Sequence, residues 1–138
     1  MEIPNCFYRV SVKALILNET RDKFLICEEE AGTWDLPGGG LDFGMTPQED
    51  LPREIDEEMG LKVSKMADNP SYFVTEKKVN KDQWKACIIY EAELESLDFT
   101  PSDECVGIRF VDKNDIVGLE VFESVKKLAE MFTPENYR

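Results

Sequence analysis

Apolar and polar residues alternate through residues 7–17, which is the period of a β-strand whose two faces differ. One face carries Tyr8, Val10, Val12, Ala14 and Ile16. The polar stretch 18–22 follows, and the apolar run 24–27 comes directly after it. Two strand-like runs joined by a short polar turn predict a β-hairpin.

Signals for the start and the end of a helix bracket residues 46–60. Thr46 is placed to cap the first turn, Pro47 suits the first helical position and Glu49 completes a capping box. Gly60 is a typical residue for the end of a helix. Pro52 interrupts the pattern, because a proline inside a helix removes a backbone hydrogen bond and crowds an earlier carbonyl. We expect either a kink near residue 48 or a regular helix that begins only at Pro52.

The rest of the chain also switches between the two periods. Strands are expected near residues 71–78, 84–92 and 107–111. An amphipathic helix is expected over residues 121–132, and Thr133 with Pro134 stops it. No linker or repeat divides residues 1–138, so we expect one domain. Strands, helix, strands and helix in this order predict an α/β sandwich around a mixed sheet.

Composition and charge narrow the classes of function. No apolar run approaches the roughly 18 residues of a membrane helix, and the start of the chain lacks the basic residues of a signal peptide, so we expect a cytoplasmic protein. The net charge is −13, from 29 acids and 16 bases. This charge argues against nucleic-acid polymers as partners, since their binding needs clustered Lys and Arg. A small phosphorylated substrate that arrives with its metal ion remains compatible with it.

The four cysteines are scattered along the chain, and there is no histidine. They are Cys6, Cys27, Cys87 and Cys105. Because they form no C-x-x-C pair, a structural zinc site is not expected. Cys27 and Cys87 lie in apolar strands, so we expect them to be buried, reduced thiols.

Three glutamates of the predicted helix lie on one of its faces. Glu54, Glu57 and Glu58 stand at positions i, i+3 and i+4, which are neighbours on a helix surface. Like charges at this spacing destabilise an isolated helix by roughly 0.2–0.5 kcal/mol per pair. The arrangement is therefore best explained by a bound cation, and carboxylate oxygens suit Mg²⁺ or Mn²⁺.

Residues 34–61 resemble the Nudix box and its approach. The box is the pattern G-x(5)-E-x(7)-R-E-U-x-E-E-x-G-U, in which U is aliphatic, and the approach here is Trp-Asp-Leu-Pro-Gly-Gly. Met45 stands where the pattern has its first glutamate. The positions that match are Gly39, Arg53, Glu54, Ile55, Glu57, Glu58, Gly60 and Leu61.

The resemblance implies an α-β-α sandwich and a reaction. The reaction is hydrolysis of a diphosphate linkage in a nucleoside diphosphate derivative, by water attack on phosphorus with Mg²⁺ or Mn²⁺ on Glu54, Glu57 and Glu58. Arg53 is expected to orient Glu54 or its neighbours. The general base is expected to be a glutamate of the box or Glu104, which lies outside it. The missing glutamate at position 45 implies a slower or unusually selective enzyme, and Met45→Glu is expected to raise turnover.

Two other functions remain open, and so do the residues that would contact the base and the phosphates of a substrate. One is a noncatalytic module of the same fold that binds a nucleotide or a protein. The other is a different chemistry on this fold, such as diphosphate isomerisation. The glycines Gly38, Gly39 and Gly40 are expected to let the backbone approach the helix and the substrate closely. The candidates for stacking on a base are Trp34, Phe43, Tyr72 and Trp84, and those for reaching phosphate are Arg9 and Lys13.

Overall fold

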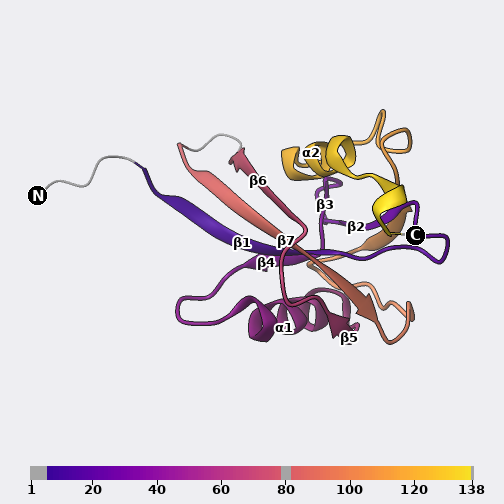
Figure 1. Cartoon of the computed structure of the whole chain (residues 1–138), viewed down its shortest axis with the longest axis horizontal. Helices are drawn as coiled ribbons and strands as arrows, with labels where there is room; N and C mark the ends of the chain where they lie inside the picture. Colours follow the sequence, from indigo (N-terminus) through magenta and orange to yellow (C-terminus); the bar gives the residue numbers. More distant parts are fainter. Residues whose placement is uncertain (1–5, 79–81, 138) are drawn as a thin grey trace, which may run out of the picture.

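The computed structural model describes residues 6–78 and 82–137 (Figure 1). The first half contains β1 (Tyr8–Leu15), β2 (Phe24–Glu28), β3 (Trp34–Asp35), β4 (Gly38–Gly40), α1 (Pro47–Met59) and β5 (Val63–Met66). The second half contains β6 (Tyr72–Lys77), β7 (Trp84–Leu94), β8 (Gly107–Val111), α2 (Glu123–Met131) and the 3₁₀ helix η1 (Pro134–Tyr137). The strands expected in the second half are confirmed, as are both helices.

The strands form two separate sheets, and the larger sheet contains both parallel and antiparallel pairs. Its order is β4-β1-β7-β5, with β6 also paired to β7, and the smaller sheet has the order β3-β2-β8. β1 and β7 run parallel, in the register that places Tyr8 beside Trp84 and Leu15 beside Glu91. All the other ladders of the described strands are antiparallel. Antiparallel β4 thereby ends beside the middle of β1, where the functional residues discussed below meet.

The two helices lie on opposite sides of the strands (Figure 1). On one side Leu51 and Ile55 of α1 share a buried cluster with Val12 of β1. On the other side Val125 and Leu128 of α2 share a second cluster with strand residues. The alternation of β1 places successive side chains in these two layers, because neighbouring residues of a strand point to opposite faces. The α/β sandwich with a mixed sheet is therefore confirmed.

Helix α1 begins and ends where its sequence predicts. The Thr46 side chain accepts a hydrogen bond from the Glu49 backbone, and the Glu49 side chain accepts one from the Thr46 backbone, which is a complete capping box. Gly60 closes the helix at φ 67°. Pro52 lies inside one continuous helix, so the alternative of a regular helix that begins at Pro52 is wrong. The glutamate face consequently belongs to a single helix.

The prediction that the first two strands form a hairpin is wrong, because β1 and β2 share no ladder of hydrogen bonds. β1 pairs with β4 and β7, whereas β2 pairs with β3 and β8 in the other sheet. Only the isolated bridge between Leu17 and Phe24 joins the two segments beside their turn. Local alternation predicted both strands, but it carries no information about which distant strand each one pairs with.

The cysteine prediction is correct for one residue and wrong for another. Cys87 is free and buried, as expected. Cys27 forms a disulfide with Cys105, so it is not a reduced thiol. Cys105 lies just before β8, which pairs with β2, and this pairing brings the two Cα atoms to 5.9 Å, within the range that a disulfide spans. In the described parts of the chain, no helix has the length and apolar character needed to cross a membrane.

Two glycines of β4 allow this strand to lie against β1 and α1. Gly38 has φ +123°, and a Cβ added there would lie 2.2 Å from the backbone oxygen of Val12. A Cβ added at Gly39 would lie 2.7 Å from the nearer carboxylate oxygen of Glu54. The first obstacle is rigid backbone, whereas the second is the end of a flexible side chain. Gly38 is thus required by the fold, and Gly39 leaves room for the Glu54 carboxylate.

Alanine at these two positions should affect stability differently. We expect Gly38→Ala to lower the free energy of unfolding by on the order of 3 kcal/mol, because it adds a backbone collision to an unfavourable φ. Gly39→Ala should lower it by about 1 kcal/mol or less, because Glu54 can turn aside. Urea unfolding of both variants measures the difference. Equal losses would contradict this account of the packing between β4 and its neighbours.

Candidate active site

Helix α1 presents its three box glutamates in different surroundings. The Glu58 carboxylate lies 3.4 Å from the backbone nitrogen of Gly38, whose N–H donates to it. Glu54 lies against Gly39 and is half-buried. Glu57 is exposed and is held by Arg53 at 2.9 Å. The helix therefore brings the three predicted metal ligands to one face, with two of them against the turn that begins β4.

Arg53 is the centre of the acidic cluster. Its guanidinium donates to the carboxylates of Glu57 at 2.9 Å and Glu54 at 3.2 Å, which agrees with its expected place beside the glutamates. It also donates to Asp42 at 2.9 Å and to Asp50. The hydrogen bonds with Asp50 and Glu57 raise the pKa of Arg53, so its charge is permanent. One cation thus holds four carboxylates that would otherwise repel one another.

Asp50 is a part of this cluster that the sequence analysis missed. It is completely buried, and its second oxygen accepts a hydrogen bond from the backbone of Asp42 at 3.0 Å. It therefore connects the loop before α1 to Arg53. The available signal was its position three residues before Arg53, a spacing at which opposite charges meet on a helix.

Burial changes the proton affinity of the two inner glutamates. It raises the pKa of Glu58 to about 8, although the charge of Lys13 and the Gly38 N–H act in the opposite direction. Burial also raises the pKa of Glu54, against the charge of Arg53. Removal from water disfavours an ionised carboxylate that lacks enough positive charge nearby. A bound cation would supply that charge, so this part of the site fits a metal ion.

The three carboxylates do not converge as they stand. Within residues 6–78 and 82–137, no group of three Asp, Glu, Cys or His side chains is close enough to form a ready-made metal site. Arg53 holds Glu57 outward, and Glu58 turns toward Gly38. The chemistry of the donor set still fits Mg²⁺, which keeps several waters and needs only one or two protein carboxylates.

Glu104 lies on an exposed turn beside the end of α1. The Ser102 hydroxyl accepts hydrogen bonds from the backbone of Glu104 and Cys105, and it donates to the carbonyl of Glu58 at 2.9 Å. This turn brings Glu104 close enough for its charge to contribute to the raised pKa of Glu58. The structure therefore places the candidate base from outside the box beside the candidate metal ligands.

Met45 is half-buried in the turn before α1, and its N–H donates to the carbonyl of Asp42. The carboxylates of Asp42 and Asp50, from the same part of the chain, pair with Arg53. Arg53 is therefore ion-paired without a glutamate at position 45.

Lys13 is buried in the middle of β1, with 4% of its surface exposed. Its ammonium donates to Asp35 at 3.0 Å and to the carbonyls of Leu36 and Gly38, each at 3.3 Å. Burial acts to lower its pKa, but the charges of Asp35 and Glu58 outweigh burial and raise the pKa to about 12. The expectation that Lys13 reaches phosphate does not fit a side chain whose donors are all engaged within the protein. Arg9, the other candidate, donates to the carbonyl of Leu41 at 2.7 Å.

A pocket of about 910 Å³ lies beside the Lys13–Asp35 pair, at the N-terminal end of α2. Asp35 belongs to its lining, and Glu76 forms another buried part of it. Glu76 is held by Lys85 at 3.2 Å and by the backbone N–H of Ser124 at 2.7 Å, so it caps α2 from a neighbouring strand. The pocket therefore has a fixed floor, and Asp35 in its lining is linked through Lys13 to Gly38, whose N–H donates to Glu58.

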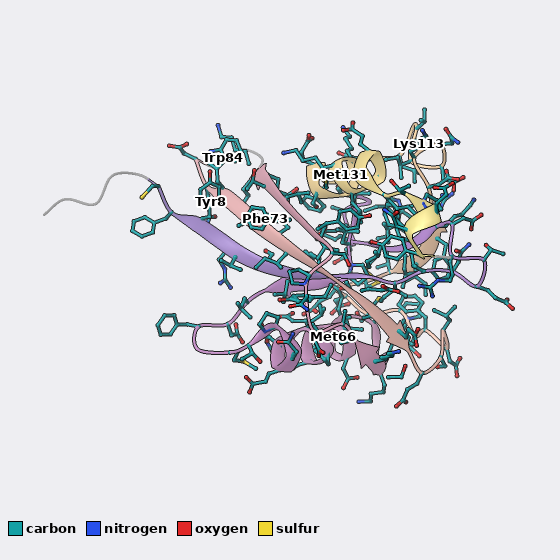
Figure 2. All side chains as sticks on the ribbon, viewed as in Figure 1. Tyr8, Met66, Phe73, Trp84, Lys113 and Met131 are labelled. Carbon is teal, nitrogen blue, oxygen red and sulfur yellow. A yellow bond between two sulfur atoms is a disulfide. The ribbon has the colours of Figure 1, made fainter. Side chains whose placement is uncertain are left out.

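The four aromatic candidates for stacking on a base lie in different parts of the structure. Trp84 lines the pocket and contacts Tyr8 edge to face, with ring centroids 6.4 Å apart, near the free end of the sheet (Figure 2). Phe43 is fully exposed away from the pocket lining. Trp34 and Tyr72 pack against the cluster beneath α2. Trp84 is thus the one candidate of the four that lines the pocket.

Comparison with known proteins agrees with this architecture. The family described as the NUDIX domain matches residues 7–132. The putative 8-oxo-dGTP diphosphatase 3 of Mycobacterium tuberculosis is 31% identical over 91 residues, which are 65% of this chain and 42% of that protein. The RNA pyrophosphohydrolase of Ruthia magnifica is 35% identical over 68 residues, covering 47% and 38% of the two chains. The matched segments are therefore less than half the length of these relatives.

Solved structures extend the likeness to nearly the whole fold. The MutT protein from Methanosarcina mazei Go1 has a TM-score of 0.76 at 27% identity, covering 95% of this chain and 96% of that one. A NUDIX family hydrolase from Clostridium perfringens has a TM-score of 0.70 at 18% identity, covering 96% and 99%, which shows the fold alone. Because the family match spans almost all of the chain and includes the acidic helix and the glycine strand, this protein belongs to the Nudix family.

Proposed function

We propose that the protein is a divalent-metal-dependent pyrophosphohydrolase that cleaves the diphosphate linkage of a small nucleoside diphosphate derivative. The observation that carries the proposal is the glutamate face of α1, where Arg53 pairs with Glu54 and Glu57 and the Gly38 N–H donates to Glu58. Membership of the Nudix family and the names of the matched relatives support the same reaction class. Water is the nucleophile, and phosphorus is the atom attacked.

Glu54, Glu57 and Glu58 would hold Mg²⁺ or Mn²⁺ in this reaction. Such an ion supplies charge for the phosphate oxygens and lowers the pKa of a bound water. The protein contributes two conditions for ion binding. Burial of Glu54 and Glu58 favours a cation, and the Gly38 N–H holds the Glu58 carboxylate. Because protons compete for a carboxylate whose pKa is about 8, metal affinity should rise as the pH increases toward that value.

The remaining residues of the site orient the metal ligands or take a proton from the attacking water. Arg53 limits the movement of Glu54 and Glu57 through charge-assisted hydrogen bonds. Glu104, exposed and beside Glu58, is the proposed general base, which takes the proton of the attacking water. The glycines of β4 allow the phosphates to approach the backbone closely.

The pocket beside Asp35 would receive the nucleoside part of the substrate. Trp84 and Phe122 offer apolar surface, and lysines from β6, β7 and α2 surround the pocket, although the chain as a whole carries a charge of −13. A base and sugar fit a volume of about 910 Å³, which lies in the usual range for small-ligand sites. The overall negative charge favours a small nucleotide over a nucleic-acid polymer.

A noncatalytic nucleotide- or protein-binding module is the second candidate, and the substitution of Met45 favours it. Turnover separates the two. Nucleoside triphosphates, sugar nucleotides, ADP-ribose and dinucleoside polyphosphates should be incubated with and without Mg²⁺ while phosphate products are measured. Metal-dependent release from one class supports the enzyme, whereas binding without release across all classes identifies the module.

Glu57→Gln and Glu58→Gln should each lower Mn²⁺ affinity and turnover by at least about tenfold, since an amide keeps the shape but loses the charge. Calorimetric titration measures the affinity, and circular dichroism verifies the fold. The control is Asp56→Asn, on the same helix but paired with Lys62 at the surface. Unchanged metal affinity in both glutamine variants would remove the metal-site assignment.

Glu104→Gln should reduce kcat by about 10²–10⁴-fold with little change in KM, because a general base acts on water and not on the ligand. The neighbouring Asp103→Asn is the matched control and should remain near wild type. A reduction below about tenfold would transfer the role of the base to Glu54 or another glutamate of the box.

Met45→Glu should raise kcat/KM by no more than about tenfold, at the low end of the range for outer partners of a metal site. The reason is that Asp42 and Asp50 already pair with Arg53. The gain should be larger in an Asp42→Asn background, where Arg53 has lost one carboxylate. Equal gains in the two backgrounds would show that Asp42 does not take the place of the absent glutamate.

A further inference from the structure

Lys13 is a buried cation that the proposed reaction does not use directly. An ammonium is strongly destabilised away from water unless it is paired and hydrogen-bonded. It occupies the middle of β1, opposite Ile89 of β7 in the parallel register of the two strands. A lysine at such a position needs a reason beyond packing, because an apolar residue would fill the layer beneath α2 at lower cost.

The hydrogen bonds of Lys13 decide between two roles. A lysine ammonium has three protons. Here they go to the carboxylate of Asp35 and to the carbonyls of Leu36 and Gly38, within 3.0–3.3 Å. No donor remains for a phosphate oxygen, and only 4% of the residue is exposed. The side chain is therefore arranged to hold protein groups in place, not to contact the substrate.

The groups that Lys13 holds lie on both sides of one short turn. This turn, residues 35–38, carries the chain from β3 of the smaller sheet to β4 of the larger one. Its middle is fixed separately, since Ala14 donates its backbone N–H to the Pro37 carbonyl at 2.9 Å. At one end Asp35 lines the pocket, and at the other the N–H of Gly38 donates to Glu58.

We propose that Lys13 is the positioning residue of the active site. Its ammonium fixes the turn of residues 35–38, so that the Gly38 N–H orients Glu58 for the metal ion while Asp35 stays at the floor of the pocket. The inference rests on the proposed metal site and adds a residue outside the Nudix box to it. One side chain thereby couples the geometry of the pocket to that of the glutamate face.

A simpler explanation is that Lys13 only neutralises the buried charge of Asp35. The two explanations differ when both charges are removed. If neutralisation is the whole role, the double variant Lys13→Met/Asp35→Asn should regain both stability and metal affinity. If Lys13 positions the turn, the double variant should regain stability but not affinity, because the carbonyls of Leu36 and Gly38 still lack their donor.

The experiment is calorimetric titration with Mn²⁺ in the absence of nucleotide, together with urea unfolding of each variant. We expect Lys13→Met to weaken Mn²⁺ binding by about tenfold or more, the range associated with partners that orient metal ligands. Asp35→Asn alone should bind Mn²⁺ within about twofold of wild type, because the ammonium keeps both carbonyls and an amide oxygen. Lys62→Met, which removes the surface pair with Asp56 of α1, is the matched control and should not change binding.

The double variant decides the result even if Lys13→Met does not fold, because the double variant itself buries no unpaired charge. If the double variant binds Mn²⁺ about tenfold more weakly than Asp35→Asn, the positioning role is supported. If the two variants bind Mn²⁺ equally, the positioning role is overturned. Glu58→Gln distinguishes the two proposals. If Mn²⁺ binding is lost in Glu58→Gln but kept in both Lys13 variants, only the positioning role fails. If wild type, Glu57→Gln and Glu58→Gln all bind Mn²⁺ equally, the metal site and the positioning role fail together.

Discussion

Repulsion among carboxylates gathered in one small volume is the constraint on which this site depends. Glu54, Glu57 and Glu58 share a helix face, and Asp42 and Asp50 lie next to it. Arg53 offsets part of this charge through ion pairs with four of the five, while Glu58 is stabilised by the charge of Lys13 and one backbone N–H. The remaining imbalance favours a cation, so the same repulsion that weakens the isolated protein prepares it for a metal ion.

The second requirement is close contact between backbone and carboxylate, which the strand β4 provides. Gly38 passes so near the Val12 carbonyl that no side chain fits there, and Gly39 leaves its space to Glu54. The backbone of β4 thereby lies close to α1 and the Glu54 carboxylate. The buried ammonium of Lys13 also holds the start of this strand, because it donates to the carbonyls of Leu36 and Gly38, each 3.3 Å away. Rigidity at this point is valuable, because an error of about 1 Å in a site of this kind can reduce the rate about 10²-fold.

The pocket and the acidic face meet the two ends of a single turn, residues 35–38, so each is built from different elements. The glutamates belong to α1, whereas the walls of the pocket come from β6, β7 and the start of α2. In the proposed function, substitutions in these walls would change the pocket for the nucleoside without moving the acidic helix. Relatives named for such different substrates as 8-oxo-dGTP and RNA are consistent with this separation.

The sequence by itself determined the features that depend on neighbours along the chain. Caps at Thr46 and Gly60 and the spacing of the glutamates specify α1 and its acidic face, because hydrogen bonds and side-chain contacts within a helix span only three or four residues. Tertiary structure alone decided that β1 and β2 join different sheets and that Cys27 meets Cys105. It also decided that Lys13 is buried against Asp35, 22 residues away. Strand pairing brings together segments whose order carries no local signal, so the partners of a buried charge can be identified only once the chain has folded.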